Sequence, residues 1–329
     1  MTHQAYIRGI GYYAPEKVLT NADLEKIVET SDEWITTRTG IKERHIAAPG
    51  ETVSDMAAEA ARRALADAGL PADAITHIFL YTVTPDYYTP SAACLMEEKL
   101  GIRGKVVQDV NAACCGYIYG LEMARAVIAL HPEAKVIVAA AEVLTSRTNF
   151  SDRRTCVLFG DAAAAAVVTA EAASGKARVV DARLASDGSL GHLLTIKGGG
   201  SGHPYKLGDV VDEEFFLQMN GPEVFKHAVR SMAAVGEEIM AAHGLTNDDI
   251  ALFIPHQANL RIMEAVARKL ALPPEKIMST VARFGNTSAS TIGIALVEAR
   301  NAGRIPAGGK VLLGAFGGGF TWGSALLQF

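Results

Sequence analysis

The sequence predicts an α/β fold built from two similar halves, stacked as five layers in the order α-β-α-β-α about a pseudo-two-fold axis. Helix-like stretches alternate with short apolar strand-like stretches, which indicates sheets covered by helices. Several stretches of the first half recur in the second at a nearly constant offset, which indicates a duplication. The 329 residues also exceed what one compact core usually holds. We therefore expect one half at 1–172 and the other at 173–329.

The duplication is visible as matched sequence in the same order along both halves. The stretch 68–80 resembles 243–254, and further matches follow. The matched pairs are Gly69 with Gly244, Ile75 with Ile250 and Lys135 with Lys310, each 175 residues apart, and Lys105 with Lys276, 171 apart. Partial matches also arise by chance in α/β proteins, but several that keep one offset favour duplication. Because equivalent turns of two halves converge about a two-fold axis, we expect one shared pocket.

Each half is expected to run helix, strand, helix, strand, helix, strand and closing strand. The helices are expected at 56–68, 91–100 and 116–130 in the first half and at 223–243, 258–271 and 289–302 in the second. In the third helix, apolar residues recur at helical spacing, as Leu121, Ala124, Val127 and Ile128. The start of that helix is rich in Ala and Gly and nearly uncharged, which predicts a helix buried between the sheets.

Composition and charge exclude several classes of protein. A net charge of −5 offers no basic field, so we expect no nucleic-acid partner. The four cysteines form neither a disulfide framework nor a Cys-x-x-Cys pair, so we expect a reducing compartment and no metal site. The chain does not start with a signal segment, and its longest apolar run, 162–170, is too short to cross a bilayer. We therefore expect a cytoplasmic protein with no membrane partner.

The most informative local feature is Cys114, which lies between a strand-like stretch, 105–110, and the helix expected at 116–130. The unpaired N–H groups and the positive dipole end of that helix favour a thiolate over a thiol. The thiolate is the nucleophilic form of cysteine. The alternative is a small buried hydrophobe, which is what we expect of Cys94 and Cys156. The local pattern leaves both interpretations open.

Three segments of the second half supply complementary groups. His256 follows an apolar stretch, at the carboxyl end where sites of α/β proteins form. Asn286 lies in a Gly-led turn 172 residues after Cys114, so the duplication maps it near the cysteine. The stretch 315–324 holds consecutive glycines, whose N–H groups can approach an oxyanion. Singly, these are typical of a surface histidine, a turn and a strand bend. Together they form a nucleophile with two neutral donors, suited to polarise a carbonyl or stabilise an enolate.

These motifs resemble the β-ketoacyl-(acyl-carrier-protein) synthase III family, the initiating condensing enzymes of type II fatty acid synthesis within the thiolase superfamily. The resemblance covers nearly the whole chain and implies a thiolase-like fold. It rests on Thr30-Ser-Asp-Glu-Trp-Ile-Thr-Thr-Arg38, Pro90-Ser-Ala-Ala-Cys94, the Cys114 motif, Phe159-Gly-Asp-Ala162, Pro255-His-Gln-Ala-Asn-Leu-Arg261, Gly285-Asn-Thr-Ser-Ala289 and Phe316-Gly-Gly-Gly-Phe-Thr-Trp-Gly-Ser-Ala325.

The resemblance implies a decarboxylative Claisen condensation of an acyl-CoA primer with malonyl-acyl-carrier protein, which yields a 3-oxoacyl-acyl-carrier protein, CoA and CO2. It assigns the acyl-thioester intermediate to Cys114 and an oxyanion hole to the N–H groups of Cys114 and Gly318. His256 and Asn286 would hold the malonyl thioester oxygen. A thiolase would carry a second cysteine for proton transfer, so Asn286 favours the decarboxylative reaction. Coenzyme A is a substrate here, and no cofactor or metal is implied.

The resemblance also assigns residues that bind CoA. Adenine would stack on Trp34, with Arg38 and Arg153 near the nucleotide and Asn259 along the pantetheine tunnel. An indole stacks on a base, and a guanidinium binds phosphate bidentately. A core aromatic is the alternative for Trp34, but its charged neighbours in the sequence disfavour it.

The expected carrier partner is acidic, so a net-negative enzyme needs a local basic patch. Arg261, Arg268 and Lys269 are spaced to share one face of the helix after His256. An ordinary solvated helix face is the alternative. The resemblance also implies a homodimer.

Two positions depart from the family pattern. Cys115 stands where Ala or Ser is common. Thr89 stands where some members have a bulky Phe that closes the acyl tunnel, so we expect a longer tunnel that accepts medium or branched primers as well as acetyl. The glycine-rich stretch 197–208 is expected to border the tunnel and the subunit interface.

Three other functions remain open at this point. The first is a secondary-metabolism relative that uses an unusual acyl starter or transfers the acyl group to an oxygen or nitrogen nucleophile. The second is a type III polyketide synthase, which shares the triad but is generally longer. The third is an inactive paralogue that binds acyl-CoA, which the intact triad, the oxyanion glycines and Trp34 disfavour.

Overall fold

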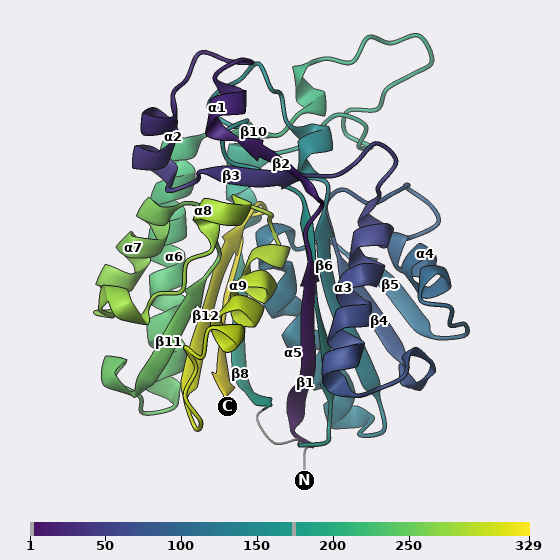
Figure 1. Ribbon diagram of the computed structural model, residues 1–329, viewed down its shortest axis with the longest axis vertical. Helices are drawn as coiled ribbons and strands as arrows, with labels where there is room; N and C mark the ends of the chain where they lie inside the picture. Colours follow the sequence, from purple (N-terminus) through teal and green to yellow (C-terminus); the bar gives the residue numbers. More distant parts are fainter. Residues whose placement is uncertain (1–2, 173–175) are drawn as a thin grey trace.

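The computed structural model describes residues 3–172 and 176–329. Its elements alternate as the sequence predicts (Figure 1). The first half contains β1 (Ala5–Tyr13), α3 (Val53–Ala68), β4 (His77–Tyr81), α4 (Ala92–Lys99), β5 (Val106–Val110), α5 (Gly116–Leu130), β6 (Lys135–Glu142) and β7 (Ala162–Thr169). The second contains β8 (Ala177–Ser186), α6 (Gly221–Ala242), β11 (Ile250–Pro255), α7 (Leu260–Lys269), α9 (Ser290–Asn301), β12 (Lys310–Gly317) and β13 (Thr321–Gln328). The boundary predicted between 172 and 173 falls at residues 173–175, which lie outside the described residues.

The strand order shows the duplication directly. The strands form one nine-stranded sheet in the order β11-β12-β13-β8-β1-β7-β6-β4-β5, which is nearly a mirror image about the β8–β1 pair. That pair joins the halves through only a short antiparallel ladder, between residues 5–7 and 177–179. One element differs, because the counterpart of β5 is reduced to a single bridge between Phe253 and Ile277. Pro273 and Pro274 precede Ile277, and proline cannot donate to a ladder.

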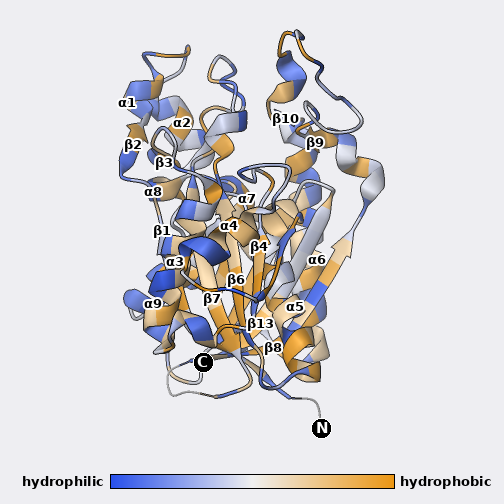
Figure 2. Cartoon of the chain, turned by 90° about the vertical axis from the view of Figure 1, so that its right-hand side faces the viewer, coloured by the Kyte–Doolittle hydropathy of each residue, from blue (hydrophilic) through white to orange (hydrophobic). Residues whose placement is uncertain are grey.

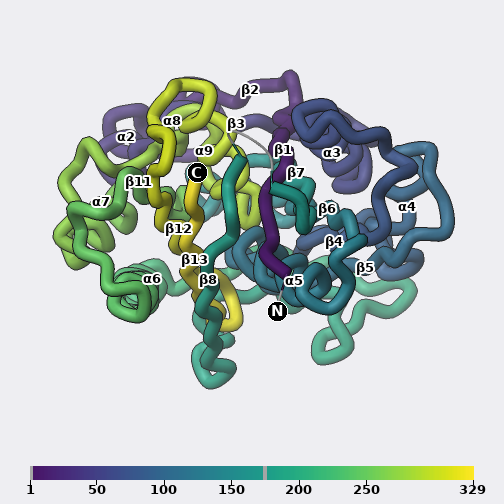
Figure 3. Tube along the Cα trace, turned by 90° about the horizontal axis from the view of Figure 1, so that it is seen from below, coloured from purple at the N-terminus to yellow at the C-terminus, as the bar shows by residue number. Residues whose placement is uncertain are grey.

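The layers also follow the prediction. Helices α3 and α4 contact β1, β4, β5, β6 and β7 from the outside of the first half, and α6 and α7 pack together on the outside of the second. Helices α5 and α9 contact each other and lie between the halves (Figures 1 and 3). Figure 2 shows the inner strands in hydrophobic colours and the hydrophilic residues mainly on outer helices and loops. The sequence around α5 is long and apolar enough for a membrane span, but here it is the central helix of the core.

The site residues gather because parallel strands end at one edge. Strands β4, β5 and β6 run parallel to one another, and so do β11 and β12. Cys114 follows β5, His256 follows β11 and Gly318 follows β12. This edge lies away from the termini, beneath the end formed by α1 (Asn21–Leu24), α2 (Asp32–Thr39), β2 (Lys17–Thr20), β3 (Glu43–Ile46), β9 (Leu194–Thr195) and β10 (Gln218–Met219) (Figure 1). Such an edge is where sites of α/β proteins form.

Glycines bring the central helices close to the sheet. A Cβ at Gly116 would stand 2.6 Å from the Cβ of Tyr81 and 3.0 Å from that of Ala289. A Cβ at Gly120 would stand 2.3 Å from Cγ1 of Val138. Only a residue without a side chain fits at either position. The start of α5, and with it Cys114, is thereby fixed against β4, β6 and the segment that begins α9.

Candidate active site

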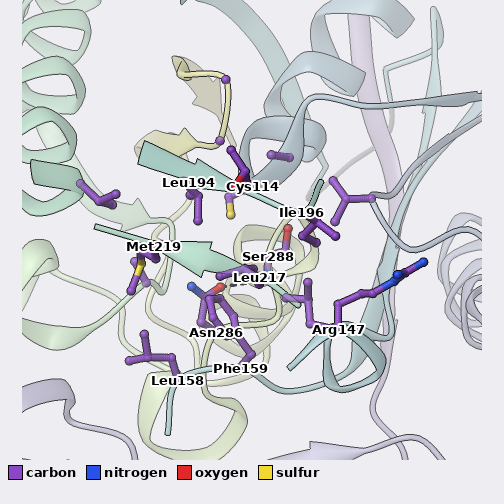
Figure 4. A pocket seen from close by; sticks show the side chains of 18 of the residues that line it. Cys114, Arg147, Leu158, Phe159, Leu194, Ile196, Leu217, Met219, Asn286 and Ser288 are labelled. Atoms are coloured by element: carbon purple, nitrogen blue, oxygen red, sulfur yellow. Dashed lines mark hydrogen bonds between the residues drawn. The ribbon is translucent and has the colours of Figure 1, made fainter. Parts of the chain in front are cut away.

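One cavity of about 1060 Å³ joins the predicted catalytic residues. Cys114, His256, Asn286 and Gly318 all line it, so the structure brings the two halves of the predicted site together. Figure 4 shows the Cys114 sulfur directed into the cavity, with Ser288 and Asn286 on the facing wall. The apolar lining includes Leu158, Phe159, Leu194, Ile196, Leu217 and Met219. A large apolar cavity with a few convergent polar groups is typical of a small-molecule site.

Cys114 lies in a short 3-10 turn, Ala113–Cys115, immediately before α5. Ala113 has a φ of 45°, a left-handed conformation that turns the chain from β5 into the helix. Burial raises the pKa of Cys114 to about 12, the nearby carboxyl of Glu142 also raises it, and the hydroxyl of Ser288 lowers it. Burial thus opposes the thiolate that we expect the helix terminus to favour.

His256 is buried directly after β11, and both its backbone and its ring form hydrogen bonds. Its backbone N–H donates to the carbonyl of Gly314 at 2.7 Å, and its Nδ1 lies 2.7 Å from Oγ1 of Thr291. Burial lowers the pKa of His256 to about 3, so the ring is neutral throughout the range in which the protein would work. The other ring nitrogen is left for a ligand in the cavity.

Asn286 is oriented by its own backbone. Its N–H donates to the carbonyl of Leu158 at 2.8 Å, and its Oδ1 accepts the N–H of Ser288 at 2.9 Å. Gly285, at a φ of 64°, makes the turn before it, and a Cβ there would stand 2.9 Å from that same carbonyl. Because Oδ1 is occupied, Nδ2 is the amide atom available to a ligand, and it can only donate.

The glycine-rich turn between β12 and β13 packs against the nucleophile. A Cβ at Gly317 would stand 2.6 Å from the backbone nitrogen of Cys114. Gly318 follows and lines the cavity, as predicted for a donor of the oxyanion hole. The close approach of the two backbones explains why glycine is needed here.

The four residues predicted to bind CoA divide into two groups. Arg38 and Asn259 line the cavity, whereas Trp34 and Arg153 do not. The guanidinium carbons of Arg38 and Arg153 lie 4.7 and 5.2 Å from the ring centroid of Trp34, so two exposed arginines flank a half-buried indole in one cationic cluster. Asn259 caps α7 through its side-chain oxygen, which accepts the N–H of Ile262 at 2.9 Å. Its amide nitrogen remains available to the tunnel.

The predicted basic patch lies on α7. Arg261 lines the cavity at the start of the helix, whereas Arg268 and Lys269 are exposed in its last turn. Arg268 has an acidic neighbour, Glu264, at 3.9 Å, which reduces its net contribution to a positive patch.

The remaining cysteine and loop predictions have mixed outcomes. Cys115 is buried and donates to the carbonyl of Thr321 at 3.3 Å, away from the cavity. Cys156 is buried as expected, but Cys94 is exposed, because its position on α4 faces out of the core. From the stretch 197–208, Lys197, Gly198 and Gly200 line the cavity, as predicted for its border.

Thr89 does not line the cavity of the single chain. It is exposed, whereas Tyr87 and Tyr88 of the same loop do line the cavity. Among the described residues no group of three or more His, Cys, Asp or Glu is arranged to hold a metal ion.

Sequence reasoning missed three polar side chains around the triad: Glu142, Ser288 and Thr291. All three are buried. A usable signal existed, because Glu142 ends the apolar stretch of β6, Ser288 lies two residues before α9, and Thr291 lies in the first turn of that helix, next to a run of apolar residues. Buried polar groups without a packing role commonly support a site.

Known proteins resemble the chain over its whole length. Models of the 3-oxoacyl-[acyl-carrier-protein] synthase III family match residues 108–188 and, for its C-terminal part, residues 240–329. A beta-ketoacyl-[acyl-carrier-protein] synthase III from Oleidesulfovibrio alaskensis is 55% identical over 100% of both chains. One from Nitratidesulfovibrio vulgaris is 58% identical over 98% of this chain and 97% of its own.

Solved structures agree. The crystal structure of 3-oxoacyl-[acyl-carrier-protein] synthase III from Aquifex aeolicus is 45% identical, with a TM-score of 0.89 over 99% of this chain and 100% of that one. The thiolase-like fold and the duplicated layers predicted from the sequence are thereby confirmed. The chain belongs to the beta-ketoacyl-[acyl-carrier-protein] synthase III family of condensing enzymes.

Proposed function

We propose that this chain condenses an acyl-CoA primer with malonyl-acyl-carrier protein, giving a 3-oxoacyl-acyl-carrier protein, CoA and CO2, as the first condensation of type II fatty acid synthesis. The observation that carries the proposal is the convergence of Cys114, His256 and Asn286 on one cavity at the carboxyl ends of parallel strands. The names of its relatives give the same reaction class.

In the first half-reaction, Sγ of Cys114 attacks the carbonyl carbon of the acyl-CoA thioester. The C–S bond to CoA breaks, and CoA leaves as a thiol once it has gained a proton. The N–H groups of Cys114 and Gly318 stabilise the oxyanion between these events. A preformed donor of this kind contributes on the order of 10²–10³ in rate.

In the second half-reaction, malonyl-acyl-carrier protein loses CO2, and the resulting enolate carbon attacks the acyl group on Cys114. Negative charge builds on the malonyl thioester oxygen. Asn286 Nδ2 and neutral His256 donate to that oxygen without a charge that titrates near neutrality. The Cys114 sulfur then leaves as the tetrahedral intermediate collapses.

The substrates approach through the exposed end of the cavity. The cluster of Trp34, Arg38 and Arg153 supports nucleotide binding there, because guanidinium groups bind phosphate. Arg261, Arg268 and Lys269 of α7 support the docking of an acidic carrier protein beside the same opening. No cofactor enters the proposed reaction.

A homodimer is supported by the edge of the sheet. Within 3–172 and 176–329, strand β5 is the last strand on its side and pairs only with β4. Val106 on that strand is 56% exposed. An exposed β-branched edge strand is a site for pairing with a second chain. Asp109 of β5 accepts the N–H groups of Ala92 and Ala93, each at 2.7 Å, so the loop with Thr89 lies next to this edge.

The acyl-tunnel prediction for Thr89 depends on this second chain, since Thr89 faces solvent in one chain. Replacing Thr89 with Phe is expected to shift the preference toward acetyl-CoA. The phenyl ring at the subunit edge would shorten the acyl tunnel of the neighbouring chain. Competition between acetyl- and octanoyl-CoA, read as kcat/KM ratios, measures the shift. An unchanged ratio in a dimeric T89F protein would contradict the prediction.

The donor role of His256 requires a specific tautomer. The Thr291 hydroxyl has one proton and two acceptors within reach, Nδ1 of His256 at 2.7 Å and the carbonyl of Ser288 at 2.9 Å. Neutral His256 can donate through Nε2 only when Nδ1 carries no proton and instead accepts a hydrogen bond from the Thr291 hydroxyl. Thr291→Val is therefore expected to lower kcat of condensation about 10-fold, and Thr291→Ser to restore it. Equal kcat values in T291V and T291S would contradict this role.

The proposed function is tested by incubating the protein with an acyl-CoA and malonyl-acyl-carrier protein. The mass of the carrier protein is then measured by mass spectrometry. A carrier mass that corresponds to the 3-oxoacyl product, absent with Cys114→Ala, is expected. A carrier that gains the acyl group without chain extension would contradict condensation.

A further inference from the structure

A carboxyl group without a cationic partner lies buried behind the nucleophile. Glu142, at the end of β6, is fully buried and forms no ion pair with any described residue. The hydroxyls of Thr84 and Thr82 donate to its Oε2 at 2.7 and 3.1 Å, and the N–H of Val83 donates to it as well. The hydroxyl of Ser288 donates to Oε1 at 3.1 Å. A buried carboxylate is costly unless it is well bonded, so this cage keeps an acceptor in place at some expense of stability.

Ser288 connects this carboxyl group to Cys114. Its hydroxyl faces the Cys114 sulfur in the cavity (Figure 4) and lowers the pKa of the thiol, and its backbone is fixed at a φ of 52° between Asn286 and α9. A hydroxyl has a single proton. While that proton points at Glu142, the Ser288 oxygen can only accept the S–H of Cys114. The three groups then form a continuous path from sulfur through hydroxyl to carboxylate.

We propose that Glu142 receives the thiol proton of Cys114 through the Ser288 hydroxyl when the enzyme takes up its acyl group. This step rests on the proposed role of Cys114 as the acyl carrier. The S–H bond breaks as that proton binds the Ser288 oxygen, and the original Ser288 proton moves to Glu142. The Ser288 hydroxyl then donates to the thiolate. Glu142 returns its proton along the same path to the sulfur of the departing CoA, so every proton is accounted for. Ser288 touches the reacting sulfur, and Glu142 acts through it.

Charge conservation within the site favours this path over loss of the proton to water. Export of the proton would leave a thiolate and a carboxylate side by side in a buried site, whereas the relay leaves one negative charge throughout. Burial raises the pKa of Cys114 to about 12 and that of Glu142 to about 7, so both groups resist a second charge. The other groups that face Glu142 are the uncharged Thr82, Thr84 and Val83 N–H, and His256 nearby in the cavity is neutral.

The test is the pH dependence of Cys114 acylation, measured by rapid quench and intact mass spectrometry between pH 5.5 and 9. In the unaltered protein the rate is expected to rise with a midpoint near 7 and then level off, as Glu142 becomes able to accept a proton. In Ser288→Ala and in Glu142→Gln we expect the midpoint to disappear, and the rate at pH 7 to fall on the order of 10²-fold.

Thr82→Val is the matched control, because it removes one donor to Glu142 but leaves the path through Ser288. We expect it to keep a midpoint. S288A and E142Q could instead lower the acylation rate by the same factor at every pH and keep the wild-type midpoint. That result would exclude the relay and show that the two residues only support the fold. If E142Q does not fold, S288A decides the question alone.

Iodoacetamide separates failure of the relay from failure of the proposed function. Alkylation of Cys114 needs the thiolate but no acyl-CoA, so its pH profile must show the same midpoint even if the protein accepts no primer. Peptide mapping is required, because Cys94 is exposed and will also react. A Cys114 alkylation rate that rises in E142Q would show that Glu142 acts only by repulsion, which would overturn the proposal.

Discussion

Replacing Asn286 with Asp is expected to lower the rate of condensation by about 10³-fold, while acylation of Cys114 persists. The two side chains have the same shape, and one Asp oxygen can still accept the N–H of Ser288 as Oδ1 does now. The other oxygen replaces the only atom of this side chain that can donate into the cavity. A carboxylate there repels the negative charge that develops on the malonyl thioester oxygen, whereas the amide stabilises it.

The two half-reactions separate this effect from general damage. Formation of acyl-Cys114 is followed by mass spectrometry without the malonyl substrate, and condensation is followed by release of CO2. Loss of both activities together in N286D, or retention of condensation within 10-fold, would contradict the assigned role. Asn286→Ala is expected to be less impaired than N286D, because it removes a donor without adding a charge.

Gly317→Ala is expected to abolish detectable acylation of Cys114. The added Cβ would stand 2.6 Å from the backbone nitrogen of Cys114 and 3.2 Å from the Cβ of Ala113. Both neighbours are rigid parts of the turn before α5, so the two backbones must separate. That movement displaces both predicted donors of the oxyanion hole, on Cys114 and Gly318. The overpacking itself costs about 1–3 kcal/mol of stability.

Gly188→Ala provides the control for this substitution. Gly188 is exposed, and a Cβ there meets no atom within 4 Å. We expect G188A to acylate at the normal rate. Thermal unfolding shows whether G317A is folded at the assay temperature. A folded G317A protein that acylates at the rate of G188A would show that the close approach is not needed.

The architecture was predictable because duplication leaves a long-range signal in the chain. Gly69 and Gly244, and Lys135 and Lys310, lie in equivalent turns and strands of a nearly mirrored sheet. The constant offset also explains why the sequence alone places Asn286 near Cys114. Where the repeat has diverged, as at Ile277, the sequence predicted a strand and the structure has only one bridge.

The electrostatics of the site were not predictable in the same way. The position of Cys114 before a helix suggested a thiolate, but the desolvation of the thiol depends on packing between the halves and raises its pKa. The contacts of Glu142 with Ser288 and of His256 with Thr291 join residues 146 and 35 positions apart. Neither spacing corresponds to a local motif, so only the fold shows these pairs.

The central claim is that Cys114 carries the acyl group, and intact-protein mass spectrometry after incubation with acyl-CoAs from acetyl to dodecanoyl tests it most directly. Cys115→Ser is the matched control, because Cys115 points away from the cavity. We predict an added mass of one acyl group in the unaltered protein and in C115S, and none in Cys114→Ser. An adduct that survives in C114S, or one lost in C115S, would contradict the account.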